Sequence, residues 1–529
     1  MKRTRRFCTL LLTIAAMLTA MAQEAGNYKP DKRNVQLDST NLPIVFIEVN
    51  GTMIQKDDYI TARMKVVNNG EGKMNYRDTV AHPGQQIDYD GYIALKYRGS
   101  SSFYNADKKP YTIRPIDKPL EENGKKQKVA FMGMPKDNNW ALLSAYADKT
   151  LMRDLLSFIL ARPYMEYVPQ GRYCEMLLDG MYYGVFIMCE KVTKGKYRLN
   201  LEEPGDEGDE LTGDYLVEVD RSDEPGFRSD FSPYNNSGRP YKGYYTPYIK
   251  FAEPDGDEIT TNQMAYIQQA FHDMEASFLT GNYAEFVDVT SMIDYQIATE
   301  LAHNVDGYRL STNLYKRRDS KDKRFKTSLW DLNLGWGNAD YYYGSNTNTW
   351  IYQLNPTLYS RGDEQMVPFW WYVMNHDKTY IKALERRWTL CRYGGYSNER
   401  INAVIDSLAL TLTCNDAVTR NYKAWPRLST YVWPNSYVGG TYANEVAHLK
   451  QWASQRLQAM DRTLYKPVKG DVNGDGEVSV ADITMLVSLV LAQKSNPRSD
   501  VNEDTETSIA DISALVGILT NDSSTATVN

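Results

Sequence analysis

The sequence predicts an α+β protein with a β-rich lobe, a helical lobe and a small all-helical domain at its C-terminal end. Up to residue 221, most apolar residues stand in short alternating runs, which are typical of strands. Beyond that point, apolar residues recur mostly at helical spacing. Two acidic loops, each followed by an amphipathic helix, end the chain. A β-rich half before a helix-rich half predicts two lobes with a cleft between them.

Composition indicates a folded protein and argues against nucleic acid as a partner. The chain has 529 residues, of which 42% are hydrophobic and 24% are charged. This length allows roughly two to four domains with a substantial core. The formal net charge is -7, and the lysines and arginines are scattered rather than gathered into a basic stripe. We therefore expect no nucleic-acid partner.

Residues 1–22 have the pattern of a secretory signal peptide. The basic segment MKRTRRF precedes the apolar run CTLLLTIAAMLTA, and AMA before Gln23 is a cleavage site between small residues. An N-terminal membrane anchor is the alternative, but the apolar run is short, and no later segment is long and apolar enough to span a bilayer. The sequence predicts export to a secreted, periplasmic or cell-surface location, with no transmembrane segment after signal cleavage.

The β-rich half starts with residues 23–90, which lead into the first lobe. The expected elements are strands at 43–50 and 92–99, a strand at 110–114 after two lysines, a helix at 149–162 and a hairpin at 171–192. The stretch DGMYYG supplies the turn of the hairpin.

Four cysteines remain after signal cleavage: Cys174, Cys189, Cys391 and Cys414. Cys174 and Cys189 stand on the two strands of the expected hairpin, so a disulfide between them is compatible with the pattern. Buried free thiols fit the pattern equally well. No cysteine spacing matches a zinc site, and the five histidines are dispersed.

The second half of the chain is mostly helical. Helices are expected at 262–280, 294–305, 377–390, 398–412 and 444–464. We place the main domain, which joins this half to the first lobe, at residues 91–465.

A carboxylate and an amide follow one of these helices. Asp306 stands at the end of a predicted helix, Asn313 comes seven residues later, and Asp331 ends an apolar strand. Phosphoryl transfer needs a carboxylate that orients the attacking hydroxyl, and a second carboxylate, with an amide, that holds magnesium. Lys108 or Lys109 would neutralise the phosphates. The structural alternative is that Asp306 is a cap or turn residue and that the lysines lie on a solvated strand edge.

The C-terminal domain, residues 466–529, carries a duplicated loop. DVNGDGEVSVAD begins at Asp471 and DVNEDTETSIAD at Asp500, an offset of 29 residues. Each loop places oxygen donors at positions 1, 3, 5, 7 and 12, with a backbone carbonyl at position 7, as calcium requires. The expected calcium ligands are Asp471, Asn473, Asp475, Glu477 and Asp482 in the first loop, and Asp500, Asn502, Asp504, Glu506 and Asp511 in the second.

The second loop departs from the first at its sharp turn. Thr505 stands where the first loop has Gly476, so we expect a weaker or strained second calcium site. The duplication resembles the type I dockerin module over residues 468–522. The resemblance implies a cohesin partner and a setting of polysaccharide degradation.

Several blocks of the main domain, taken in order, carry a second resemblance. They are RGSSSFYNADKKPYTI, LLSAYADKTLMRDLLSFILAR, LLDGMYYGVFIMCEKV, NVDGYRLSTNLY, WDLNLGWG and LKQWASQRLQAMD. From about residue 40 to 465 the chain resembles the spore coat protein H (CotH) kinase family. The resemblance implies an atypical, secretory protein kinase fold that uses ATP with magnesium or manganese. Its acceptors would be serine or threonine residues of exported proteins.

The same resemblance implies roles for individual residues. Asp306 would be the catalytic carboxylate and Asp331 a metal ligand, with Asn313 and Asn333 beside it. The implied nucleotide-binding residues are Arg98, Ser100, Ser101, Ser102, Lys108, Lys109 and Glu190. The family often has Asp at the position of Asn333, so this substitution would weaken metal binding. It often has Asn at the position of Ser100, so the phosphate-facing loop would differ.

Three functions stay open at this point. The first is an active exported kinase, tethered through the dockerin-like module. The second is a catalytically silent fold kept as a surface, adhesion or scaffold-associated protein in polysaccharide degradation. The third is a carbohydrate-active enzyme of another type, with Glu218 and Asp220 as its acids. These two residues are two positions apart on a strand and share one face, so a structural role is the alternative for them.

Overall fold

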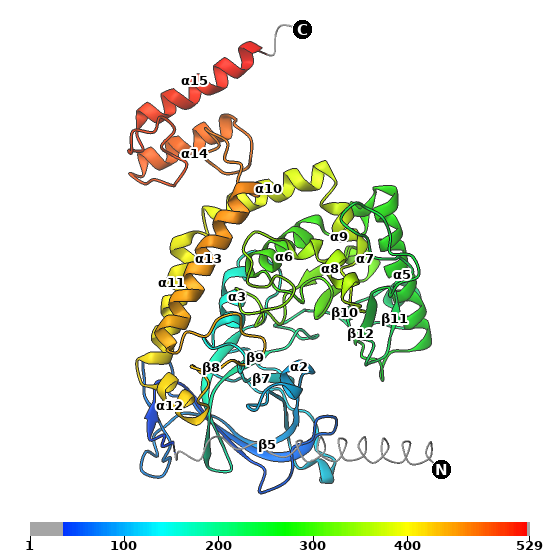
Figure 1. Ribbon diagram of the computed structural model, residues 1–529, viewed down its shortest axis with the longest axis vertical. Helices are drawn as coiled ribbons and strands as arrows, with labels where there is room; N and C mark the ends of the chain where they lie inside the picture. Colours follow the sequence, from blue (N-terminus) through cyan, green and yellow to red (C-terminus); the bar gives the residue numbers. More distant parts are fainter. Residues whose placement is uncertain (1–34, 526–529) are drawn as a thin grey trace, which may run out of the picture.

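The computed structural model describes residues 35–525, so the predicted signal peptide lies outside the described residues. The architecture is α+β, as predicted. A β-rich N-terminal region precedes a helical region, and a small helical domain ends the chain (Figure 1). None of the helices within the described range combines the length and apolar character that crossing a membrane requires.

Seven strands of the N-terminal region close into a barrel in the order β2-β3-β5-β6-β7-β9-β8. They are β2 (Ile44–Glu48), β3 (Ile60–Val67), β5 (Ile87–Tyr97), β6 (Tyr111–Ile116), β7 (Trp140–Leu143), β8 (Gly171–Leu178) and β9 (Met181–Glu190). The parallel pairing of β2 with β8 closes the barrel. Two short strands, β1 (Ser39–Thr40) and β4 (Asn75–Tyr76), pair with each other. The expected domain boundary at residue 90 falls inside β5, so the segment before it contributes strands to the same barrel.

The hairpin of β8 and β9 confirms the turn predicted from the sequence. Leu178 pairs with Met181, which leaves Asp179 and Gly180 as a two-residue turn. Both turn residues have positive φ, 46° and 74° respectively. Such turns favour Asp-Gly because glycine and aspartate tolerate the left-handed conformation better than other residues do.

All four cysteines of the described chain are free thiols. Cys174 lies opposite Phe186 in the hairpin, whereas Cys189 lies opposite Gly171. Cys174 packs in the hydrophobic cluster of the barrel, and Cys189 packs in the separate cluster shared with the helical region. The two thiols therefore lie on different sides of the hairpin, and the cross-hairpin disulfide does not form.

A second sheet follows the barrel along the chain, in the order β11-β12-β10-β13-β14. Its strands are β10 (Tyr215–Asp220), β11 (Gly226–Arg228), β12 (Tyr248–Glu253), β13 (Thr312–Lys316) and β14 (Lys326–Ser328). The main helices are α3 (Arg153–Ala161), α5 (Thr261–Thr280), α6 (Val289–Ala302), α8 (Asn355–Ser360), α9 (Phe369–Met374), α10 (Lys378–Arg392), α11 (Asn398–Thr413), α12 (Ala417–Ala424) and α13 (Tyr442–Leu464). Shorter turns of helix are α2 (Ser101–Tyr104), α4 (Gly208–Leu211) and α7 (Asp319–Asp322).

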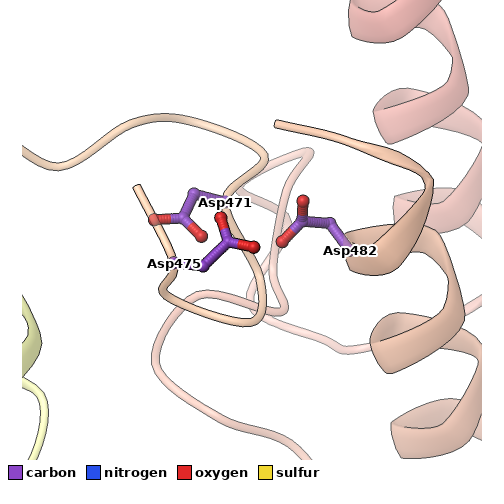
Figure 2. Close-up of side chains that lie close together, drawn as sticks. All are labelled: Asp471, Asp475 and Asp482. Atoms are coloured by element: carbon purple, nitrogen blue, oxygen red, sulfur yellow. The ribbon is translucent and has the colours of Figure 1, made fainter. Parts of the chain in front are cut away.

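The C-terminal domain consists of the two acidic loops and the helices α14 (Val480–Leu491) and α15 (Ile509–Thr525). Its small core contains Val472, Leu486, Val501 and Leu515. In the first loop, the carboxylates of Asp471, Asp475 and Asp482 point toward one another (Figure 2).

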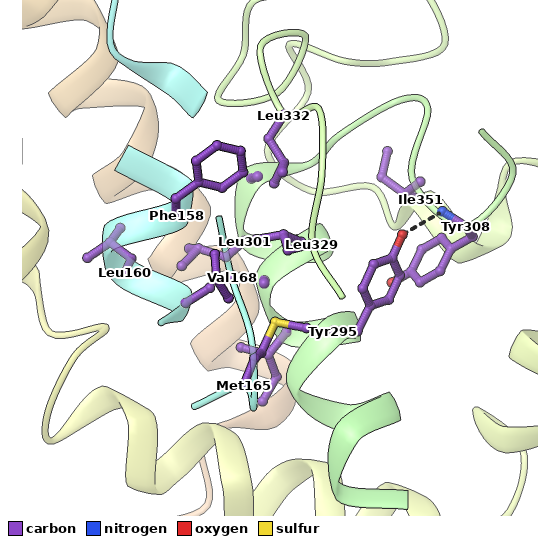
Figure 3. Close-up of a cluster of buried hydrophobic side chains, with 14 of the residues drawn as sticks. Phe158, Leu160, Met165, Val168, Tyr295, Leu301, Tyr308, Leu329, Leu332 and Ile351 are labelled. Atoms are coloured by element: carbon purple, nitrogen blue, oxygen red, sulfur yellow. Dashed lines mark hydrogen bonds between the residues drawn. The ribbon is translucent and has the colours of Figure 1, made fainter. Parts of the chain in front are cut away.

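Helix α3 joins the barrel region to the helical region through a shared hydrophobic core. It packs against α6 and α11. Figure 3 shows side chains from α3, from the segment after it and from the helical region in one cluster: Phe158, Leu160, Met165, Val168, Leu301, Leu329 and Leu332. This buried core fixes the position of α3 relative to α6 and to the chain after β14.

Candidate functional site

A cavity of about 980 Å³ is lined by residues from both the barrel region and the second sheet. Ten of the residues singled out from the sequence line it: Arg98, Ser100, Ser101, Ser102, Glu218, Asp220, Asp306, Asn313, Asp331 and Asn333. Segments far apart in the sequence thus bring the candidate carboxylates and amides to one cleft.

Asp306 lies in a turn beyond α6 and faces the cavity. The helix ends at Ala302, earlier than expected, because His303 takes the left-handed conformation with φ 51°. The Asp306 carboxylate accepts a hydrogen bond from Nη2 of Arg309 at 3.0 Å. Burial raises the pKa of Asp306, while the positive charge of Arg309 opposes that shift. The side chain is 22% exposed, so it is held by its neighbours but accessible from the cleft.

Asp331 follows the second sheet and has the left-handed backbone conformation, with φ 57°. Its carboxylate accepts a hydrogen bond from the Asn333 amide, and its backbone carbonyl accepts one from the Asn304 side chain at 3.0 Å. Asp331 is exposed and lines the cavity, which the barrel region and the second sheet flank. Desolvation within the cavity, reinforced by the charge of Asp306, raises the pKa of Asp331 to about 6 against the opposing effect of Arg98.

Asn313 reaches the cavity from the second sheet. It lies on β13 directly opposite Glu218 of β10 and Ser328 of β14. Directly opposed residues of neighbouring strands share one face of a sheet, and Glu218 indeed lines the same cavity. Burial, with the nearby charge of Asp220, raises the pKa of Glu218 to about 8.

Arg98 and the serines after it form the rim of the cavity on the barrel side. The Arg98 guanidinium lies over the ring of Trp330, 5.0 Å from the ring centre. Trp330 is the residue directly before Asp331 in the chain. Gly99 has φ 81°, and a Cβ there would lie 2.1 Å from Oγ of Ser102, so only glycine fits between the arginine and the serines.

Lys108 and Lys109 do not reach the cavity. The ammonium group of Lys108 is buried and donates to the carbonyl oxygens of Ser144 and Val185 and to the side chain of Asn421. Lys109 is also buried, and its ammonium group donates to the carbonyl of Phe103. The expected phosphate-binding role does not match these positions, and neither does the alternative of a solvated strand edge, because both ammonium groups bond inside the protein.

Glu190 is likewise turned away from the cavity, whereas Lys191 lines it. The buried Glu190 carboxylate accepts the backbone N–H of Gln170 at 2.9 Å. Successive side chains of an extended chain point to opposite sides, which explains why Lys191 faces the cleft and Glu190 does not. Burial and the positive charge of Arg98 lower the pKa of Lys191 to about 7.

Asp154, in the first turn of α3, is a further cleft carboxylate that motif reasoning missed. It accepts the backbone N–H of Leu332 at 2.8 Å. Burial, with the charge of Asp331, raises the pKa of Asp154 to about 8. Its position within an apolar helix disguises it in the sequence, since the contact that matters lies 178 residues away.

The first C-terminal loop wraps its carboxylates with backbone N–H groups. Asp471 accepts the N–H groups of Gly474 and Gly476 at 2.7 and 2.9 Å. Asp482 accepts those of Asn473 and Ser479 at 2.9 and 2.8 Å. Three carboxylates with oxygens within 4.8 Å of one another form a donor set that suits a hard cation such as calcium.

The second C-terminal loop also surrounds its carboxylates with backbone N–H groups, although not all of the donors are the equivalent residues. Asp500 accepts the N–H groups of Asp504 and Thr505 at 3.0 and 2.9 Å. Asp511 accepts the N–H of Val501 at 2.7 Å. Thr505 has φ 78°, close to the 86° of Gly476 in the first loop, so a β-branched residue adopts the conformation that favours glycine. The strain expected from the sequence is therefore present in the backbone.

Comparison with protein families decides the classification. The model of the family described as CotH kinase protein matches residues 95–460, which is more than half of the chain. The chain belongs to the CotH kinase protein family. The dockerin type I domain model matches residues 469–520, immediately after the CotH domain, so this CotH protein carries a C-terminal dockerin type I domain. A comparison with curated proteins finds no match to the chain.

Proposed function

We propose that the protein is an exported atypical kinase that transfers the γ-phosphate of ATP to serine or threonine residues of exported proteins. The observation that carries this proposal is the meeting of Asp306, Asp331 and Asn313 in one cleft. These residue types are the inventory that phosphoryl transfer requires. Membership of the CotH kinase protein family and the predicted signal peptide support the same conclusion.

Asp331, Asn313 and Asn333 would hold the magnesium or manganese ion. Carboxylate and amide oxygens are suitable donors for these hard cations, and all three side chains line the cavity. The cation would neutralise charge on the phosphates of ATP. Asn333 contributes no negative charge, so Asp331 is the charged member of this set.

Asp306 would orient the acceptor hydroxyl and accept its proton. Arg309 holds the carboxylate at 3.0 Å, which limits its rotation. Because burial raises the pKa of Asp306, the carboxylate is a better proton acceptor than a fully solvated aspartate.

Arg98 and Lys191 would supply positive charge to the phosphates, together with the loop of Ser100, Ser101 and Ser102. All of these residues line the cavity. Lys108, Lys109 and Glu190 are left out of this proposal because their side chains bond within the protein away from the cleft.

The dockerin type I domain would bind calcium through its two loops and attach the enzyme to a cohesin-bearing partner outside the cell. The carboxylate arrangement of the first loop supports the calcium assignment. Attachment of this kind would place the kinase among proteins of polysaccharide degradation.

The proposal is tested with the purified chain from residue 23 to 529, labelled ATP, and magnesium or manganese. We expect nucleotide binding and phosphate transfer to serine or threonine of an added exported protein or of the chain itself. A protein that binds no nucleotide would support the silent-fold alternative. Release of reducing sugar from a polysaccharide, without nucleotide binding, would instead favour a carbohydrate-active enzyme built on Glu218 and Asp220.

A further inference from the structure

Helix α3 holds the segment that carries Asp331 at two points. Asp154 Oδ1 accepts the N–H of Leu332, the residue directly after Asp331, at 2.8 Å. One turn further along α3, Ser157 Oγ accepts Nε1–H of Trp336 at 2.8 Å. Phe158 of α3 and Leu332 also belong to the same hydrophobic cluster (Figure 3).

The same segment is tied to the end of α6, from which Asp306 follows. The side chain of Asn304 donates to the carbonyl of Asp331 at 3.0 Å, and the N–H of Trp336 donates to the carbonyl of Ala302 at 2.5 Å. The backbone of Asp331 has φ 57°. A residue in this sparsely populated conformation keeps it only when neighbouring contacts hold it there.

Asp154 supplies the carboxyl group among these contacts. Its side chain is buried, with 4% of the residue exposed, yet it lines the cleft. The start of α3 is itself rigidly held, since Asp148 accepts the N–H of Arg153 at 2.8 Å. A carboxylate in the first turn of this anchored helix therefore has a fixed position from which to orient the loop of Asp331.

We propose that Asp154 is a positioning residue for the metal site, fixing the Asp331 carboxylate in the cleft through the Leu332 N–H. This inference rests on the proposed function, because Asp331 has a metal to hold only if that function is correct. Residues that orient a metal ligand without touching the metal commonly matter as much as weaker ligands do. The contact also ties the metal ligand to a helix packed between the two regions.

Three variants of the full mature chain test the role. Asp154→Ala removes the acceptor of the Leu332 N–H. Asp154→Asn keeps an oxygen acceptor of the same size in the same place. Asp88→Ala is the matched control, because Asp88 accepts the N–H of Met132 at the same 2.8 Å but neither residue lines the cavity.

The first measurement is the affinity for ATP with magnesium. We expect Asp154→Ala to weaken it by about 10- to 100-fold and Asp154→Asn to restore most of the loss. Asp88→Ala should lower the melting temperature without changing this affinity. An Asp154→Asn protein as defective as Asp154→Ala would overturn positioning through the hydrogen bond, and so would an unchanged affinity in a folded Asp154→Ala protein.

The second measurement, hydrogen exchange at the Leu332 amide, needs no nucleotide. Asp154→Ala should accelerate this exchange, whereas Asp154→Asn and Asp88→Ala should leave it slow. Unchanged exchange in Asp154→Ala would overturn the inference. If the wild-type protein binds no nucleotide but its Leu332 amide responds as expected, the proposed function fails while the anchoring of the loop by Asp154 stands.

Discussion

The carboxylates of the first C-terminal loop and those of the cleft are assembled in opposite ways. Asp471, Asp475 and Asp482 lie within twelve residues, and backbone N–H groups from the same loop bond their oxygens. In the cleft, by contrast, Asp306 and Asp331 come from segments after different elements. Few backbone N–H groups reach them, and burial raises their pKa values.

The residues of the first C-terminal loop are brought together by local sequence, whereas those of the cleft are brought together only by the tertiary fold. Backbone N–H groups hold the loop carboxylates in place, and the one from Glu477 lowers the pKa of Asp475. In the cleft, desolvation raises the pKa values of both carboxyls, and the charge of Asp306 adds to the shift of Asp331. Their arrangement depends on nearby cations and on the packing of α3 and α6. We therefore expect calcium binding to be coupled to the folding of the small C-terminal domain.

The largest effect should come from Asp306 in the cleft. Asp306→Asn keeps the size of the side chain but removes the proton acceptor, so we expect phosphate transfer to fall by about 100-fold or more. Affinity for ATP with magnesium should change little. The measurement is the single-turnover transfer rate beside equilibrium nucleotide binding.

Asp461→Asn is the matched control for this variant. Asp461 is 25% exposed and bonds Arg392 at 2.9 Å, which resembles the 22% exposure and the arginine partner of Asp306, but it does not line the cavity. The control should lose some stability and keep its transfer rate. Equal rates in the two variants would show that Asp306 is a structural turn residue.

Removal of calcium should have the next largest effect, confined to the C-terminal domain. At calcium 100-fold above its dissociation constant, binding stabilises a folded domain by about 2.7 kcal/mol. Calorimetry of the full chain should show one transition that a chelator lowers and others that it leaves unchanged. Asp482→Ala should lower the same transition because the buried carboxylate also accepts the N–H groups of Asn473 and Ser479. If no thermal transition changed on removal of calcium, the assignment of calcium to the C-terminal domain would be wrong.

Binding of ATP with magnesium in the cleft should depend on pH. The pKa of Asp331 is raised from 3.8 to about 6, and a protonated carboxyl binds metal poorly. Affinity for ATP with magnesium should therefore fall about tenfold for each pH unit below 6. Asp331→Asn should bind more weakly at pH 7 and lose this pH dependence. Affinity that stays constant from pH 5 to 7 would contradict the role of Asp331.

The same shift has the opposite sign for the stability of the metal-free protein. A carboxyl whose pKa is higher in the folded state than in the unfolded state favours folding when protonated. The contribution of Asp331 to stability is thus fully present below pH 3.8 and is lost as the pH rises through about 6. Metal binding and metal-free stability should therefore change in opposite directions over this range.

Sequence patterns predicted the gathering of carboxylates in the first C-terminal loop, and the cleft only in part, for reasons that particular residues make clear. The loop ligands follow from spacing along the chain, because one turn of backbone brings them together. Asp306 and Asp331 follow from motif resemblance, and the fold brings both to one cavity. Burial of Lys108 depends on Asn421 of α12, a contact between residues 313 positions apart that no local pattern reveals.

Local patterns also did not determine which side chains at the end of a strand face the cleft. Glu190 and Lys191 differ by one position, and the end of β9 turns only the lysine to the cleft. A one-residue error reverses the side of an extended chain on which a side chain lies. The closed barrel escaped prediction for a related reason, since the parallel pairing of β2 with β8 joins strands more than a hundred residues apart.

The smallest predicted effect compares the two C-terminal loops with each other. Thr505 has φ 78° where Gly476 has φ 86°, and a residue with a Cβ pays about 1 to 2 kcal/mol for the left-handed conformation. Thr505→Gly should therefore stabilise the calcium-bound domain by about 1 kcal/mol, measured by thermal unfolding in saturating calcium. Thr507→Gly is the control, because Thr507 does not have positive φ and its hydroxyl contacts Ser499 at 2.6 Å. The control should destabilise the domain, whereas a destabilised Thr505→Gly protein would show that the threonine side chain, and not its backbone strain, dominates at this turn.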